Sequence, residues 1–76
     1  MLTQRPSVHV VPRDGRWAVQ MSGVRRAKAV KDTQEEAIDV GRALAQRYRT
    51  ELVVHRLDGT IRSKDSFGND PPEIPG

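Results

Sequence analysis

The sequence predicts a small α+β two-layer sandwich in the order β-β-β-α-β-β, with one helix packed on a mainly antiparallel sheet. Three observations lead to this prediction. Residues 33–49 repeat apolar side chains with a helical period, and shorter β-branched runs lie on both sides of that stretch. Turns that contain glycine separate these runs. The chain has 76 residues, which is the size of one small domain with a modest core.

The helix is predicted over residues 33–49, which read TQEEAIDVGRALAQRYR. Thr33 and Glu36 have the spacing of a capping box, in which each side chain satisfies a free backbone donor. The side expected to face the sheet carries Ala37, Val40, Gly41, Leu44 and Tyr48. We expect Gly41 to allow a close approach between the helix and the sheet near Trp17.

Three strands are predicted before the helix. Residues 7–11 are β-branched and short, residues 12–15 have turn chemistry, and residues 16–21 alternate so that Trp17, Val19 and Met21 share one face. A second turn over residues 22–26 leads to a third strand over residues 27–31. Together they form an antiparallel meander.

Two strands are predicted after the helix. Residues 51–57 form the most apolar run, and the Asp58-Gly59 dipeptide that follows predicts a two-residue hairpin loop. That loop would place His55 opposite Arg62 and turn Ile61 toward the helix. A right-handed crossover would put the strand over residues 51–57 beside the first strand, giving the sheet order 3-2-1-4-5.

One domain is predicted over residues 7–68, between a flexible N-terminus (1–6) and a Pro-rich disordered tail (69–76). There is no cysteine, no apolar leader and no apolar run long enough for a membrane span, so we expect a cytoplasmic protein that contacts no membrane. The expected core side chains are Val8, Val10, Trp17, Val19, Met21, Val30, Ala37, Val40, Leu44, Tyr48, Leu52, Val54, Ile61 and Phe67.

Several short motifs resemble those of a known family. They are His9-Val10-Val11-Pro12, Gly15-Arg16-Trp17-Ala18-Val19, Thr33 with Glu36-Ala37, and His55…Asp58-Gly59-Thr60-Ile61…Ser66-Phe67-Gly68. The family comprises small bacterial and phage-associated domains of unknown function. This chain differs from the family pattern at Arg56, where members often have glycine, and at Phe67, where tyrosine is commoner. The resemblance covers roughly residues 7–70 and implies a compact α+β domain; it supplies no reaction and no ligand.

The residues that could carry chemistry predict no enzyme, no cofactor and no metal. There is no cysteine nucleophile, and the serines lie in no catalytic motif. His9 and His55 would lie on adjacent strands and share the open face of the sheet, but two histidines without a third ligand make a poor zinc site. We therefore expect no catalytic residue and a structural or interface role for the histidine pair.

The charge distribution predicts a nucleic-acid partner, DNA or RNA. The net charge is +3, yet residues 1–31 contain seven basic residues and one acid, whereas residues 32–76 contain six basic residues and nine acids. Clustered cations on a β-meander can follow a phosphate backbone and release its counterions. The candidate residues are Arg13, Arg16, Arg25, Arg26, Lys28 and Lys31. An equally simple interpretation is a solvated basic edge that prevents strand aggregation.

Two further considerations bear on the partner. Trp17 and Tyr48 are expected in the core, which would leave no aromatic platform for single-stranded nucleic acid. The alternative is a protein-interaction or homodimerisation module that uses the open sheet face, because a semi-apolar patch is expected there. The interface residues of that alternative are Val53, His55 and Leu57, beside Val11 and Ala18.

Overall fold

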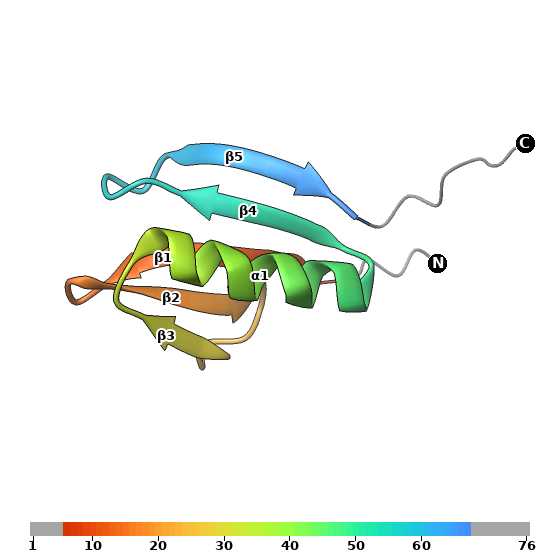
Figure 1. The fold of residues 1–76 in the computed structure, drawn as a ribbon, viewed down its shortest axis with the longest axis horizontal. Coiled ribbons are helices and arrows are strands. Elements are labelled where there is room, and N and C mark those ends of the chain that lie inside the picture. The colour runs from red at the N-terminus through yellow and green to blue at the C-terminus, as the bar shows by residue number, and fades with distance from the viewer. Residues whose placement is uncertain (1–5, 68–76) are drawn as a thin grey trace, which may run out of the picture.

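The computed structural model of the chain describes residues 6–67 and confirms the α+β fold. Within these residues, five strands form one sheet, and a single helix lies across one side of it (Figure 1). The elements are β1 (Val8–Arg13), β2 (Arg16–Met21), β3 (Ala29–Lys31), α1 (Gln34–Tyr48), β4 (Glu51–His55) and β5 (Ile61–Ser66). The expected disordered tail and all but Pro6 of the expected flexible N-terminus lie outside the described residues.

The sheet has the predicted order β3-β2-β1-β4-β5. β1 and β4 are parallel, with Val8 opposite Leu52, and the other neighbouring pairs are antiparallel. β1 is longer than predicted, because Pro12 and Arg13 continue the ladder with β2 after the pairing with β4 has ended at Val10. Proline has no backbone N–H, and it is tolerated at position 12 because no neighbouring strand requires a hydrogen bond from that position.

Thr33 caps the start of α1, as the sequence predicts, and Arg49 caps its end. The Oγ1 of Thr33 accepts a hydrogen bond from the Glu36 backbone N–H at 3.1 Å. Arg49 ends the helix in the left-handed conformation (φ 53°), and its N–H donates to the carbonyls of Ala45 and Gln46. Acids occupy the first turn and a basic residue the last, which matches the helix dipole.

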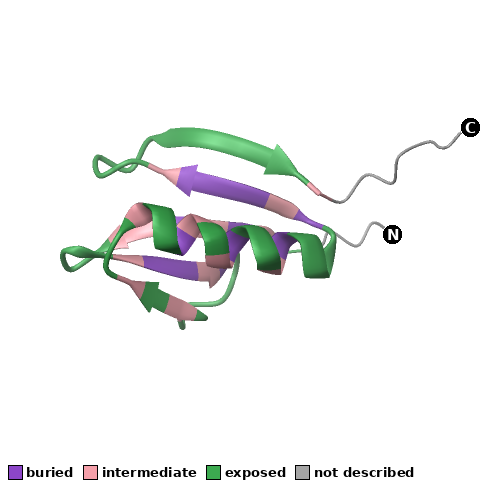
Figure 2. Cartoon of the chain, viewed as in Figure 1, coloured by how far each residue is buried: buried purple, intermediate pink, exposed green. Residues whose placement is uncertain are grey.

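The core lies between α1 and the three central strands. Its largest fully buried side chains are Leu52, Val8, Val10, Val19 and Val54, which Figure 2 shows as buried segments of β1, β2 and β4. Gly41 allows the predicted close approach, since an added Cβ would lie 2.8 Å from Leu52 Cδ1 and 3.1 Å from Val10 Cγ2. The contact is therefore with β4 and β1, and the expectation that it involves Trp17 was wrong.

The β1–β2 turn is the two-residue hairpin of this fold. Arg13 lies opposite Arg16, and both intervening residues have positive φ, 51° for Asp14 and 79° for Gly15. This is the backbone of a type I′ turn, whose twist matches that of the flanking strands.

The β4–β5 loop is longer than predicted. The N–H of Arg56 donates to Thr60 O at 2.7 Å, and a register shift then places His55 opposite Ile61. The predicted two-residue loop was wrong because Asp58 closes a local turn instead, accepting bonds from the backbone N–H of Thr60 at 3.0 Å and from its hydroxyl at 2.7 Å. These bonds hold the pKa of Asp58 below its ordinary value, the hydroxyl bond most strongly.

Three side chains expected in the core lie at the surface. Ile61 is 53% exposed, because the register shift turns it away from the helix. Val30 is 45% exposed, since it lies opposite Ala18 on the side of the sheet that α1 does not cover. Tyr48 is 43% exposed at the last residue of α1. Trp17 and Phe67 do pack against the core, as predicted.

Candidate nucleic-acid interface

The sheet has two ends that differ in charge. We call the first the turn end: it holds the β1–β2 turn, the start of α1 and the β4–β5 loop, all at the left of Figure 1. We call the second the loop end: it holds the β2–β3 loop (residues 22–28) and the end of α1. Both segments lie at the end of the sheet where β4 begins. Ser22, at the start of the β2–β3 loop, donates its N–H to Ser7 O at 2.8 Å, and the next residue, Val8, lies opposite Leu52 of β4.

The six predicted basic residues are divided between these ends. The turn end has Arg13, Arg16 and Lys31, and the loop end has Arg25, Arg26 and Lys28. Between them runs β2, whose six residues span about 17 Å. The structure therefore brings the six residues together as two groups of three.

The turn end is close to charge balance. Arg16 Nε lies 3.4 Å from Asp32 Oδ1, and both side chains are exposed, so this pair contributes less than about 1 kcal/mol to stability while cancelling both charges locally. The basic residues at this end are Arg13, Arg16, Lys31, Arg56 and Arg62; the acids are Asp14, Asp32, Glu35, Glu36 and Asp58. A polyanion approaching the turn end therefore meets no net excess of positive charge.

Several polar side chains at the turn end are also bonded within the chain. Gln34 Nε2 donates to His55 O at 3.0 Å, and Gln34 Oε1 accepts from Arg62 Nη1. Arg56 Nη1 donates to Ile61 O at 3.0 Å. These cations act as structural donors that hold the β4–β5 hairpin to itself and to the start of α1.

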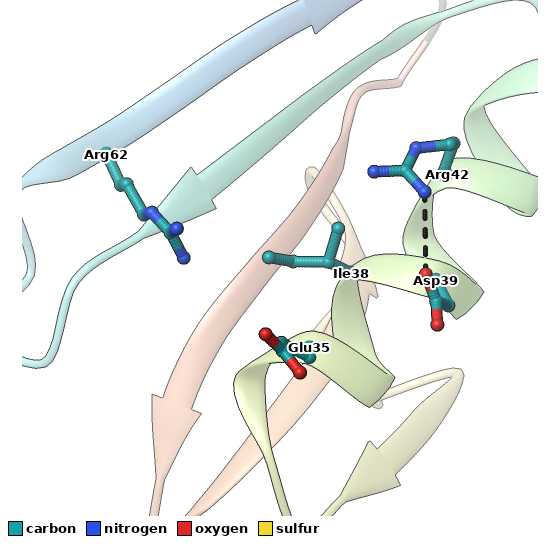
Figure 3. Close-up of a pocket in the computed structure, with 5 residues that line it drawn as sticks. All are labelled: Glu35, Ile38, Asp39, Arg42 and Arg62. Atoms are coloured by element: carbon teal, nitrogen blue, oxygen red, sulfur yellow. Dashed lines mark hydrogen bonds and ion pairs between the residues drawn. The ribbon is translucent and has the colours of Figure 1, made fainter.

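A shallow groove beside α1 illustrates the same balance. In Figure 3, Arg62 lies across the groove from Glu35 and Ile38, while Asp39 and Arg42 form an ion pair of 3.4 Å on the helix. Two acids and two arginines line it, so it has no preference for an ion of either sign.

The loop end is basic and contains no acid on its loop. Residues 15–31 include no aspartate or glutamate, and Arg25, Arg26 and Lys28 are all exposed. The backbone of the loop is anchored, since Val24 N–H donates to Met21 O at 3.1 Å and Lys28 N–H to Val19 O at 2.6 Å. The side chains of the three cations make no hydrogen bond or ion pair to any residue within 6–67.

The end of α1 adds to this positive charge. Arg47 is exposed in its last turn, and Arg49 is the C-cap. Two acids of the described strands lie near this end: Glu51, which Lys64 engages at 3.7 Å, and Asp65, which lies opposite Leu52 on β5. Sequence reasoning missed Arg47 because it treated the helix and the meander separately. The predicted topology already contained the signal, since β2 and α1 both end where β4 begins.

The open face of the sheet, meaning the side not covered by α1, is the other predicted interface. Ala18 (0% exposed) and Val53 (4%) lie on it but are covered by their neighbours. Val30 and Ile61 are the exposed apolar side chains of this face. Of the predicted interface residues, Val53 and His55 lie on the open face, whereas Leu57 lies in the β4–β5 loop and is 78% exposed.

The two histidines meet on the open face, as predicted. His9 Nδ1 lies 3.0 Å from His55 Nε2, and His55 Nδ1 lies 3.3 Å from Gly59 O. Because a carbonyl can only accept, His55 Nδ1 carries the hydrogen, and neutral His55 accepts from His9 Nδ1–H. The ring centres are 5.3 Å apart, which is about the N···N distance plus the two ring radii, so the rings meet end to end.

This contact affects the titration of His9. Partial burial lowers the pKa of His9, and repulsion from a charged His55 lowers it further.

No group of three or more metal-ligating side chains occurs within residues 6–67. Over the same residues, no helix is both long and apolar enough to cross a membrane.

Comparison with known proteins places the chain in a family. The profile of the family described as "Uncharacterized protein conserved in bacteria (DUF2188)" matches residues 8–67, which include all six elements of the fold. The chain belongs to this family. The bacterial domain of unknown function that the motifs indicated is thereby confirmed, while its phage association stays a prediction.

One curated relative is the "Uncharacterized protein YdaT" of Bacillus subtilis (strain 168). It is 36% identical over 61 residues, which are 80% of this chain and 41% of the relative. The chain therefore spans about two fifths of that protein's length. No solved structure matches the chain. Neither the family description nor the relative's name includes a reaction, a ligand or a partner.

Proposed function

We propose that this domain is a small non-enzymatic accessory module that binds nucleic acid through its loop end. The observation that carries the proposal is the exposed, acid-free β2–β3 loop with Arg25, Arg26 and Lys28. Arg47 is a further exposed cation, at the end of α1. Arg13, Arg16 and Lys31 contribute less, because acids surround them.

Physical chemistry supports phosphate as the group that these residues contact. Guanidinium groups donate two parallel hydrogen bonds to phosphate oxygens, and two of the three loop cations are arginines. Binding would release counterions from the nucleic acid, so affinity would fall steeply with salt. In the cytoplasm, where we expect the protein, nucleic acids are the abundant polyanions.

The test is fluorescence anisotropy with labelled random-sequence duplex and single-stranded DNA across a salt series. The variants are a loop-end triple (Arg25→Ala, Arg26→Ala, Lys28→Ala) and a matched turn-end triple (Arg13→Ala, Arg16→Ala, Lys31→Ala). Both remove three positive charges, so a difference between them reports position. We expect the loop-end triple to lower the slope of log K against log salt by about 0.7 to 0.9 per lost phosphate contact, and the turn-end triple to lower it less. Absence of binding at low salt, or equal losses in the two triples, would contradict the proposal.

A second candidate function is protein interaction or homodimerisation through the open face. The observation that favours it is the exposure of two apolar side chains on this face: Ile61, which lies opposite His55 of the part-buried histidine pair, and Val30 on β3. Apolar contacts are not screened by salt, so such a dimer would persist at high ionic strength. Sedimentation of the wild type and of Ile61→Lys in high salt tests this: a salt-resistant dimer that the substitution disrupts would support it.

A further inference from the structure

Tyr48 was expected in the core, but it is exposed at the loop end, where it is the last residue of α1. On this basis we infer that the loop end takes single-stranded nucleic acid, with one base stacked on the Tyr48 ring while nearby cations contact the phosphates. This inference rests on the proposed function and names the class of nucleic acid for the same site.

The position of Tyr48 follows from the geometry of α1. Gly41, Leu44 and Tyr48 follow the side of the helix that faces the sheet, and Gly41 and Leu44 pack there. Tyr48 lies one turn farther, and Figure 1 shows the end of α1 reaching beyond the tip of β2. Tyr48 therefore lies where β2 no longer covers the helix, which accounts for its 43% exposure.

Tyr48 is the aromatic residue that remains available for stacking. The chain has one tryptophan, one tyrosine and one phenylalanine, and the other two rings, Trp17 and Phe67, are partly buried against the core. The ring contact recorded among residues 6–67 joins the two histidines, so neither Trp17 nor Phe67 stacks on Tyr48. Tyr48, 43% exposed, therefore shares no ring contact with the other aromatic side chains of residues 6–67.

The chain neighbours of Tyr48 favour a ligand with both a base and a phosphate. Arg47 precedes it and is exposed, and the β2–β3 loop with Arg25 and Arg26 lies at the same end of the sheet. A base can stack on a protein ring only when its own face is not covered by neighbouring base pairs. Duplexes hide these faces, whereas single strands expose them. An exposed tyrosine that follows an exposed arginine therefore suits an unpaired nucleotide.

The experiment compares three probes of equal length by anisotropy in low salt: single-stranded oligothymidine, an abasic single strand with the same phosphates, and a duplex. The proteins are the wild type, Tyr48→Ala and the matched control Tyr48→Phe, which keeps the ring. We expect the wild type to bind oligothymidine about fivefold more tightly than the abasic strand, the lower limit for one stacked base. Tyr48→Ala should lose this preference, and Tyr48→Phe should keep it. Urea unfolding of each variant is the control for folding; because Tyr48 is partly exposed, we expect both substitutions to leave the domain folded.

The outcomes separate this inference from the proposed function. If oligothymidine and the abasic strand bind equally well to the wild type, or if Tyr48→Ala weakens both to the same extent, stacking on Tyr48 is wrong while phosphate binding by the loop end stands. A preference for the duplex would also overturn the inference alone. If none of the probes binds in low salt, both the inference and the proposed function fail.

Discussion

The turn end and the loop end belong to the same sheet but use their polar side chains differently. At the turn end, Thr33 caps the helix, Gln34 bonds to the β4–β5 hairpin, and Arg16 pairs with Asp32. At the loop end, Arg25 and Arg26 project from an anchored backbone without an acid on the same loop. One end holds the domain together, and the other leaves Arg25 and Arg26 available.

The difference shows that a count of charges along the sequence is a poor guide to a binding surface. Three of the six predicted cations lie among acids, and their field is largely cancelled. The other three keep theirs. A rigid scaffold that presents an exposed loop is also the common arrangement of functional residues in proteins.

Substitution of one glycine at each end gives the most direct comparison of the two ends. Gly15 at the turn end and Gly23 at the loop end both have φ 79°, and an added Cβ would meet open space at each. Each substitution by alanine should therefore destabilise the domain through backbone strain alone, by about 1–2 kcal/mol. Urea unfolding measures this loss.

Binding should then separate the two glycine variants. Gly15→Ala should bind nucleic acid like the wild type when folded, whereas Gly23→Ala should bind more weakly, because it disturbs the loop that carries the cations. Equal nucleic-acid affinities of the two variants would contradict the claim that the loop end binds and the turn end does not.

The helix cap tests the structural role of the turn end. Thr33→Ala removes the side-chain acceptor of the Glu36 N–H and should lower the free energy of unfolding by about 1 kcal/mol. Thr33→Ser keeps the acceptor and is the control, with nearly wild-type stability expected in a denaturant titration. Nucleic-acid affinity of folded Thr33→Ala should be unchanged; a marked loss would mean that the turn end takes part in binding.

The acids of the turn end can be removed without disturbing the backbone. Asp14→Asn suits the positive φ of that turn position, and Asp32→Asn breaks only an exposed ion pair. Freed from these acids, Arg13 and Arg16 should attract phosphate, and we expect affinity at low salt to rise about threefold. The control compares the single changes Asp32→Asn and Asp39→Asn. Each removes one negative charge and breaks one exposed ion pair of 3.4 Å, but Asp39 is not among the turn-end acids. An equal rise in these two variants would show that net charge, and not local balance, governs affinity.

The smallest expected effect is a pH dependence centred on the histidine pair. The pKa of His9 is lowered in the folded protein from its ordinary value of 6.5. Below that pH the unfolded chain binds more protons than the folded one, so the free energy of unfolding should fall from about pH 7 to about pH 5.5. Urea midpoints at these pH values measure the fall, and His9→Gln should reduce it. A fall of the same size in His9→Gln would assign it to other groups.

Much of the fold could be predicted because local signals agreed with one another. The Thr33 cap, the apolar side of the helix and the alternation in residues 16–21 each predict the observed element. The sheet order followed from the handedness of the crossover, and this order also brought His9 and His55 together on one face.

The errors arose where tertiary context decides. Asp58-Gly59 has the composition of a two-residue turn, but Asp58 bonds to Thr60 and lengthens the loop, which moves Ile61 to the opposite face. Tyr48 continues the apolar side of the helix, and periodicity does not indicate where the sheet beneath it stops. The division of the cations between the two ends could not be predicted for a similar reason, because it depends on which turns lie at the same end of the sheet.

Mapping of the bound surface by backbone amide NMR is the most direct test of the central claim. A ¹⁵N-labelled sample would be titrated with single-stranded DNA in low salt. The account predicts that the largest amide shifts occur in residues 22–28 and at the end of α1, with little change at Asp14, Gly15 and the β4–β5 loop. Shifts concentrated at the turn end or across the open face would contradict it.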